Sequence, residues 1–459
     1  MNDGVLPASF RDPSGFLFRC DGVLYRQLNR LCETHYERLM GSGLYAHLVG
    51  KGLLIPHEEV EPPIQTGPEH YRTLRPDPIA FVSYAYEWCF SQLKAAALLT
   101  LRIQRDALAH DMILKDASAY NVQFHQNRPV LIDTLSFECY RDGQPWKGYR
   151  QFCQHFLAPL ALMAHRDVRL GQLLRVHLDG IPLDLTASLL PRRAWASPGL
   201  LLHLWLHGRF QRRYAGAAAE AAGGSRPIAR SALLHMMRGL ERVVERLAWR
   251  PGGTEWDEYY GGDSYGVGSL EHKKRLVEEH LETIVPRSVW DLGANTGLFS
   301  RIAAECCENV VSFDADPACV ERSYGATRAE GKLNLLPLLV DLVNPSPGIG
   351  WANRERLSLA ERPRPDAILA LALVHHLAIS NNVPLAGVAA WFADLTPFLV
   401  IEFVPKSDPK VQTLLASRED VFPGYSREGF EAAFRRRFEI EAADEIQESD
   451  RILYRMRRR

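Results

Sequence analysis

The feature that most restricts the fold of this chain is an alternation of apolar runs with helical segments between residues 271 and 403. The apolar runs lie at 288–292, 309–316, 335–342, 366–374 and 399–403. Runs with few polar interruptions are typical of strands buried on both faces of a parallel sheet, with helices covering them. A helix and a closing hairpin are expected at the C-terminal end. The pattern predicts a doubly wound α/β domain, whose ligand should lie at the carboxyl ends of the strands.

A stretch of small residues, AGAAAEAAGGSR at 215–226, divides the chain. It lacks an apolar period and is rich in glycine and alanine, which indicates a linker. At about 150 residues per domain, a chain of 459 residues has room for two or three domains. We therefore expect a first domain at 1–214, a linker at 215–230 and a second domain at 231–459.

The segment DLGANTG connects the run at 288–292 to the helix that follows it. Gly293 permits a tight turn, and Gly297 lets the helix begin close to the strand. Asn295 stands where a dinucleotide-binding turn has its middle glycine, and the lysine of a phosphate-binding loop is absent. Asp291 adds a carboxylate, which would repel phosphate. Such a turn suits a ligand that carries positive charge and an amino-acid group, as S-adenosylmethionine does.

Further acids and histidines follow the next strands in order. Asp314 ends the second strand about 20 residues past the first glycine, where an acid can bind ribose hydroxyls. Asp341 ends the third strand, where a side chain can meet an adenine amine. His375 and His376 end the fourth strand, and a histidine suits proton removal from an acceptor. The ordered set is a stronger signal than the glycine turn alone.

With these motifs, residues 255–459 resemble the class I S-adenosylmethionine-dependent methyltransferases. The resemblance implies that Asp291 orients the methionine end of the cofactor, Asp314 the ribose and Asp341 the adenine. It also implies that His375 or His376 faces cofactor and acceptor, with a catalytic or a structural role. The aromatic segment before the first strand often closes over the cofactor in such enzymes, which makes Tyr260 a candidate cofactor contact. The segment NPSPGIGW at 344–351 is expected to form a loop on the acceptor side.

A second set of polar residues lies near residue 116. Asp116, Asn121 and Asp133 have the spacing of a kinase catalytic loop and the metal-binding acid that follows it. NVQFHQNRPVLIDT would form the hairpin between them, with its turn at Gln126–Asn127. Strands at 16–28, a helical segment at 36–54, a hinge strand at 78–88 and a helix at 91–111 are expected around this loop.

On these residues, the segment 10–213 resembles the protein-kinase-like and aminoglycoside-phosphotransferase-like folds, an α+β architecture. The resemblance implies a nucleotide and magnesium site formed by Asp116, Asn121 and Asp133. The sequence departs from these folds at three places. The loop DPSGF has only one glycine, and Arg26 stands where a phosphate-binding lysine is expected. IDT replaces the usual metal-binding motif. The domain is therefore expected to recognise an acceptor or partner, or to bind ATP with magnesium.

Over nearly its full length the chain also resembles the NoeA-like nodulation host-specificity methyltransferases, through LKDASAYN, LIDTLSF, RQFCQHFLAPLALMAHRDVRLG and NPSPGIGW. The resemblance implies a methyltransferase that acts on a small-molecule, glycan or protein acceptor. Two alternatives stay open: a bifunctional kinase–methyltransferase, and a scaffold that binds S-adenosylmethionine without catalysis.

Composition excludes several other classes. Lys and Arg total 54 against 55 for Asp and Glu, which argues against a nucleic-acid partner. The N-terminus has no signal-peptide pattern, and no apolar run is long enough for a membrane span. Eight cysteines without a CxxC pair predict buried thiols of a cytoplasmic protein. No zinc-ligand spacing is present, so no metal site is predicted. The sequence does not determine the oligomeric state.

Overall fold

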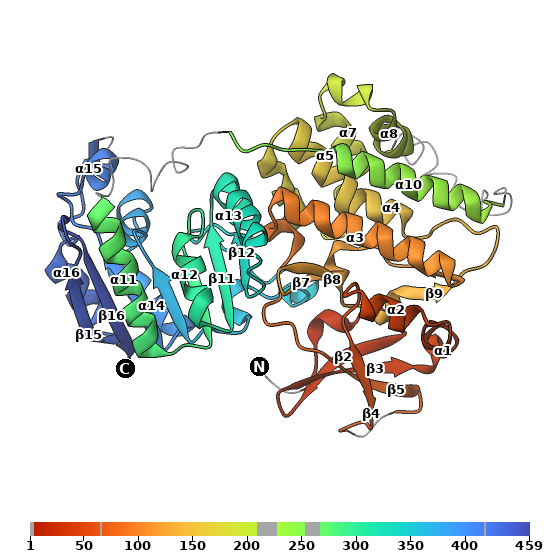
Figure 1. The fold of residues 1–459 in the computed structure, drawn as a ribbon, viewed down its shortest axis with the longest axis horizontal. Helices are drawn as coiled ribbons and strands as arrows, with labels where there is room; N and C mark the ends of the chain where they lie inside the picture. The colour runs from red at the N-terminus through yellow and green to blue at the C-terminus, as the bar shows by residue number, and fades with distance from the viewer. Residues whose placement is uncertain (1–3, 65–66, 209–226, 253–266, 417–418) are drawn as a thin grey trace. The chain divides into compact units, whose positions relative to one another are not determined.

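The computed structural model describes residues 4–64, 67–208, 227–252, 267–416 and 419–459. These residues form two compact units, each described by itself below (Figure 1). The first unit comprises Met1–Arg250 together with Pro347–Leu357, and the second comprises Pro251–Ser346 and Ser358–Arg459. The C-terminal half of the chain thus contributes one short segment to the first unit.

The first unit begins with an antiparallel sheet in the order β1-β2-β3-β5-β4. Its strands are β1 (Gly4–Val5), β2 (Gly15–Cys20), β3 (Val23–Asn29), β4 (His57–Val60) and β5 (His70–Pro76). The paired strands expected at 16–28 are β2 and β3, which a tight turn at Asp21–Gly22 connects. The helical segment expected at 36–54 forms two helices, α1 (Glu33–Gly41) and α2 (Leu44–Gly50). They are separate because Gly43 adopts a left-handed conformation between them.

The rest of the first unit is mainly helical. The long helix α3 (Phe90–Ala109) leads into β6 (Met112–Leu114), which pairs with β9 (Phe137–Cys139). Between these strands lies the expected hairpin, β7 (Val122–His125) and β8 (Arg128–Leu131), whose turn residues Gln126 and Asn127 both have positive φ. The remaining helices are α4 (Tyr149–Phe152), α5 (Ala158–His165), α6 (Leu173–Val176), α7 (Leu183–Leu189), α8 (Pro198–Leu200) and α10 (Arg230–Arg246).

Two expectations about the first unit need correction. Segment 231–250, which we expected to open the second domain, belongs to the first unit because α10 packs along α3. The ion pair between Arg105 and Glu241 joins these two helices. Of the linker expected at 215–230, residues 215–226 lie outside the described residues, and Arg230 is already the first residue of α10. The segment 78–88 is not a strand; it ends in a turn of 3-10 helix at Ala85–Glu87, which the Glu87 side chain caps.

The second unit is built on one sheet with the strand order β12-β11-β10-β13-β14-β16-β15. The first five strands in this order are parallel and the closing hairpin is antiparallel. Their bounds are β10 (Ser288–Leu292), β11 (Asn309–Asp314), β12 (Leu335–Leu339), β13 (Ala367–Ala370), β14 (Phe398–Phe403), β15 (Phe438–Glu445) and β16 (Ile452–Arg458). This confirms the α/β class. The chain reverses direction across the sheet between β10 and β13, where doubly wound folds bind ligands.

Helices cover both faces of this sheet. They are α11 (Val267–Ile284), α12 (Leu298–Cys306), α13 (Pro317–Ala329), α14 (Leu385–Leu395), α15 (Pro409–Ala416) and α16 (Arg427–Phe434). On one face, α11 and α12 share a buried core with Leu453 of β16. Successive strand residues point to opposite faces, so the neighbouring Tyr454 contacts Phe430 of α16 on the other face, with ring centroids 5.2 Å apart.

Helix α12 begins at a glycine that no other residue replaces without strain. Gly297 has φ 77° and forms the N-cap of the helix. A Cβ at this position would stand 2.4 Å from Ser323 Oγ of α13, well inside van der Waals contact. The left-handed backbone and the close approach of α13 both require glycine.

Replacing Gly297 with alanine is expected to lower the free energy of unfolding by about 1–3 kcal/mol, because both the backbone and Ser323 must adjust. Gly325→Ala is the matched control. This residue lies inside α13, and a Cβ added to it would have no other atom within 4 Å, so a gain of up to about 1 kcal/mol is expected. Urea denaturation of the full-length variants measures both values; equal stabilities would contradict the packing argument.

Candidate active site

The turn after β10 lies at the point where the strand order reverses. Gly293, Asn295 and Gly297 all have positive φ, between 52° and 77°. The backbone N–H groups of Gly293 and Ala294 donate to the carbonyl of Phe313 at 2.9 and 3.0 Å, which fastens the turn to β11. The structure therefore places the three predicted turn residues in one tight bend at the carboxyl edge of the sheet.

Asp314 closes this bend from the end of β11. Its carboxylate accepts hydrogen bonds from the backbone N–H of Asn295 at 2.7 Å and of Asp316 at 2.8 Å. Burial raises the pKa of Asp314 to about 6, although these hydrogen bonds favour the ionised form and oppose the rise. The sequence-predicted acid and the glycine turn thus form one local structure.

Asp291 lies behind the bend and faces the protein interior. It is buried, and the Ser300 hydroxyl of α12 donates to its carboxylate at 2.5 Å. Burial raises the pKa of Asp291 to about 6, while the hydrogen bond from Ser300 and the ammonium of Lys273 act in the opposite direction. Asp291 therefore joins the end of β10 to the first turn of α12.

A buried group of charges lies at the ends of β13 and β14. Glu402 of β14 accepts from the Lys273 ammonium at 2.5 Å and from the backbone N–H of Ala372 at 2.8 Å. Arg451 contacts the second oxygen of Glu402 at 3.3 Å and donates to Asp408 at 2.7 Å. Lys273 and Glu402 are almost completely inaccessible to solvent. Burial lowers the pKa of Lys273, which Glu402 opposes by favouring the ammonium form.

Sequence reasoning missed Lys273 and Arg451. A signal for Lys273 was present, because Leu270, Lys273 and Val277 follow the helical spacing of one face of α11. A lysine in an apolar stripe indicates a buried partner. The partner, Glu402, lies 129 residues away, and the sequence does not identify it.

His375 and His376 follow β13 beyond the carboxyl edge of the sheet, with their ring centroids 4.1 Å apart. His375 is fully buried, and neither of its ring nitrogens has a hydrogen-bond partner among the described residues. Burial lowers the pKa of His375 well below its ordinary value and that of His376 to about 4. Both rings are therefore neutral at pH 7. His376 is the more accessible of the two.

Two predicted cofactor contacts remain, Asp341 and Tyr260. Asp341 lies two residues beyond β12 and is exposed; its carboxylate accepts from the backbone N–H of Val343 at 2.9 Å and caps a turn. It is at the same edge of the sheet as Asp314. Tyr260 lies outside the described residues.

In the first unit, the structure brings together the second predicted set. Asn121 donates to Ser136 Oγ at 3.0 Å, and Ser136 donates to Asp133 at 2.5 Å. Burial and the charge of Asp133 raise the pKa of Asp116. Burial alone would raise the pKa of Asp133, but an ion pair with Arg26 of β3 and the hydrogen bond from Ser136 hold it below its ordinary value.

Across the described ranges, no group of three or more His, Cys, Asp or Glu side chains is arranged to hold a metal ion. Within the same residues, every helix is too short or too polar to span a bilayer.

Breaking the buried ion pair should be costly. Lys273→Met is expected to lower the free energy of unfolding by about 3–5 kcal/mol, because it leaves Glu402 buried without its ammonium partner. Lys274→Met removes the neighbouring lysine, whose pair with the exposed Glu271 lies at the surface, and should cost about 0–1 kcal/mol. Thermal and urea unfolding of the two variants measures the difference. A loss of similar size in both would show that burial of the pair does not matter.

Comparison with known proteins finds one relative of nearly full length. The chain is 37% identical over 460 residues to the nodulation protein NoeA of Rhizobium meliloti (strain 1021), covering 98% of this chain and 95% of that protein. No family model matches the chain.

Among solved structures, the N-methyltransferase NodS from Bradyrhizobium japonicum WM9 matches with a TM-score of 0.32 and 12% identity. The match covers 41% of this chain and 96% of NodS. The bifunctional kinase–methyltransferase WbdD matches with a TM-score of 0.32 and 12% identity, over 44% of this chain and 41% of WbdD. Both scores are low, and we draw no functional conclusion from them. Because the identity to NoeA extends over almost the whole length of both proteins, the chain belongs to the NoeA family.

Proposed function

We propose that the second unit binds S-adenosylmethionine and transfers its methyl group to a small-molecule, glycan or protein acceptor. One observation carries the proposal: the buried Asp291 and the partly buried Asp314 flank a glycine turn at the reversal point of the sheet. The turn residues 291–297 include no lysine or arginine. This chemistry favours a ligand with hydroxyl donors and positive charge over one that carries phosphates.

The residues at the edge of the sheet fit such a ligand. The carboxylate of Asp314 is an acceptor suited to a pair of ribose hydroxyls, and Asp341, beyond the neighbouring strand, is the proposed contact for the adenine. Leu373 packs closely against the bend, because a Cβ added to Gly293 would be 3.0 Å from Leu373 Cδ1. This side of the bend therefore has little room for a side chain at position 293. The hydrogen bond from Ser300 supports an indirect role for Asp291, in which it fixes the turn that holds the methionine end.

When bound, the cofactor supplies an electrophilic methyl group on a sulfonium. The protein's part is to align that group with an acceptor atom and to exclude water. His376, as the more accessible neutral imidazole, is the better placed of the two histidines to accept a proton from the acceptor. Its pKa of about 4 makes it a weak base, so we propose that positioning contributes more than proton transfer.

Calorimetric titration of the full-length protein with S-adenosylmethionine tests the proposal, with Asp314→Asn as the variant. The Asp314 carboxyl has a raised pKa of about 6, so it is ionised above that pH and protonated below it. Affinity should be constant above about pH 7 and fall roughly tenfold per pH unit below pH 6, as the acceptor for the ribose hydroxyls is lost. The variant should bind at least about tenfold more weakly, with a much flatter pH profile.

Glu308→Gln serves as the control, because it changes an exposed acid at the start of β11, at the opposite edge of the sheet. It should leave both the affinity and the pH profile unchanged. Absence of binding by the unmodified protein would refute the proposed function. Binding without methyl transfer to any acceptor class would instead support the scaffold alternative.

A second candidate function for the first unit is nucleotide binding with phosphotransfer. The observation in its favour is the convergence of Asp116, Asn121 and Asp133 on one loop and hairpin. The ion pair between Arg26 and Asp133 competes with it, because it neutralises the acid that would hold magnesium.

Titration with ATP and magnesium distinguishes these two roles of the first unit. If Asp133 holds the metal, Asp133→Asn should abolish ATP binding, whereas Asp106→Asn, on α3 and paired with His47, should not affect it. If the ion pair between Arg26 and Asp133 instead keeps Asp133 from binding magnesium, the unmodified protein should not bind ATP at all. In that case the unit would act in recognition.

A further inference from the structure

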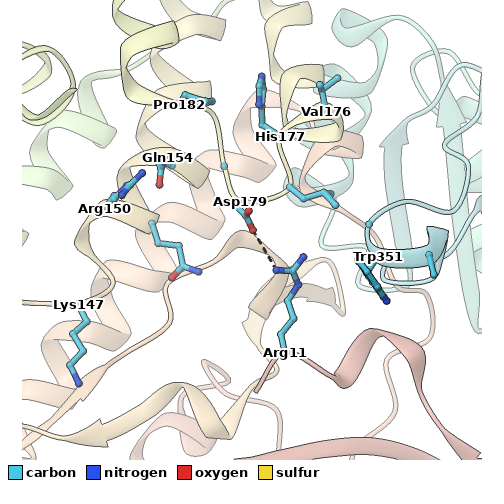
Figure 2. A pocket seen from close by; sticks show the side chains of 14 residues that line it. Arg11, Lys147, Arg150, Gln154, Val176, His177, Asp179, Pro182 and Trp351 are labelled. Carbon is cyan, nitrogen blue, oxygen red and sulfur yellow. Dashed lines mark ion pairs between the residues drawn. The ribbon is translucent and has the colours of Figure 1, made fainter. Parts of the chain in front are cut away.

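The first unit contains a cavity of about 950 Å³ that the candidate active site does not use. Its walls come from three stretches: 147–154 around α4, the loop at 176–182, and residues 350–352 of the C-terminal half; Arg11 completes them. Figure 2 shows Arg150 and Gln154 on one side of Asp179, with Trp351 on the other. The cavity therefore has an aromatic wall facing polar ones.

Trp351 is an unusual surface residue, because 74% of this large apolar side chain is exposed. It lies in a turn with Gly350, Ala352 and Asn353, all of which have positive φ. For Ala352, with φ 54°, the left-handed conformation is strained, because the Cβ atom comes close to the following carbonyl oxygen. Strain of this kind persists where the surroundings hold it in place, and it concentrates at functional sites.

Glu355 holds the turn in place. It is buried and accepts two hydrogen bonds from the guanidinium of Arg11, at 2.5 and 3.1 Å. A Cβ on Gly350 would stand 2.1 Å from a Glu355 oxygen, so only glycine lets the turn close over this carboxylate. The two hydrogen bonds from Arg11 and the close contact at Gly350 thus hold the backbone of the turn that carries the exposed indole.

The same segment is anchored beside the loop that carries Asp116. The guanidinium of Arg356 lies 3.9 Å from the ring centroid of Tyr120, and the backbone N–H of Leu357 donates to the hydroxyl of Tyr84 at 2.7 Å. From the cavity side, Gln151 accepts from the backbone N–H of Ala117 at 2.7 Å. The cavity therefore borders the residues that follow Asp116.

The charges around the cavity are largely compensated. Arg11 is paired with Glu355 and, at 3.9 Å, with Asp179. Lys147 is paired with Glu138 at 2.8 Å. Two of the three Lys and Arg side chains in the lining are therefore paired, and the third, Arg150, is exposed to solvent. Paired cations have little capacity left for a phosphate, so the lining does not favour a nucleotide or another strongly anionic ligand.

What the cavity offers instead is a flat apolar face with hydrogen-bonding groups opposite. Trp351 contributes an exposed indole to the lining, while the amide of Gln154, the ring of His177 and the carboxylate of Asp179 provide donors and acceptors. A sugar ring has the matching surfaces, because its C–H face is apolar and its hydroxyls both donate and accept. The polar lining of the cavity suits a hydroxyl-rich ligand better than an apolar one.

We propose that this cavity binds a neutral carbohydrate, with a sugar ring stacked on Trp351 and its hydroxyls bonded to the opposite wall. This assigns acceptor recognition to the first unit. Naming the carbohydrate as the methyl acceptor rests on the proposed function, whereas carbohydrate binding itself does not.

The test is saturation-transfer NMR and calorimetry of the full-length protein with neutral oligosaccharides of glucose, of mannose and of N-acetylglucosamine. At least one should bind at millimolar concentration or below. Trp351→Ala should weaken that binding about tenfold or more, and Trp351→Phe, which keeps an aromatic face, should retain most of it. Leu31→Ala removes another exposed apolar side chain outside the cavity and should change nothing.

Two results would overturn the proposal: no oligosaccharide binds, or Trp351→Ala binds as well as the unmodified protein. Displacement of the oligosaccharide by ATP would also overturn it, because the cavity would then be part of a nucleotide site. The affinity for S-adenosylmethionine is measured on the same samples and should be equal in all variants. If no sample binds S-adenosylmethionine, the methyltransferase proposal is refuted, while the carbohydrate result stands.

Discussion

The second unit depends on the buried carboxylate of Glu402. Through Lys273, Arg451 and the backbone of Ala372, it joins α11, β14, β16 and the segment after β13. A buried charge is tolerated only when its partners are in place, so these elements must dock together. The backbone at Ala372, which has φ 48°, is held by this contact, and it sets the direction of the chain that leads to His375 and His376. One ion cluster therefore positions the segment after β13, whose Leu373 packs against Gly293 of the glycine turn.

Two acids likewise hold the glycine turn between β10 and α12 in place. Asp314 binds the backbone of Asn295, and Asp291 binds Ser300, so each acid holds one end of the turn between β10 and α12. Both carboxyls have a pKa near 6 because burial disfavours their charge. Acids that are kept in this costly environment, at the reversal point of a parallel sheet, support a binding function over a purely structural one.

The first unit combines the loop and hairpin that carry Asp116, Asn121 and Asp133 with a cavity built partly by a distant segment. Arg26 is paired with Asp133, which ties the first sheet to the loop and hairpin. The segment Pro347–Leu357 contributes the indole of Trp351 from a part of the chain that otherwise forms the second unit. A recognition role for this unit and a chemical role for the other would explain why one chain keeps both.

Local sequence patterns were enough to predict the buried strands from their apolar runs, the bend from Gly293 and Gly297, and the hairpin from Gln126–Asn127. Each of these depends on neighbours within a few residues. Tertiary packing determined which unit the helix at 231–250 joins, that Lys273 meets Glu402, and that Trp351 lines a cavity in the first unit. It also determined that Asp341 caps an exposed turn and that His375 is buried. These outcomes depend on packing between segments more than a hundred residues apart or on burial, and local sequence patterns do not encode either.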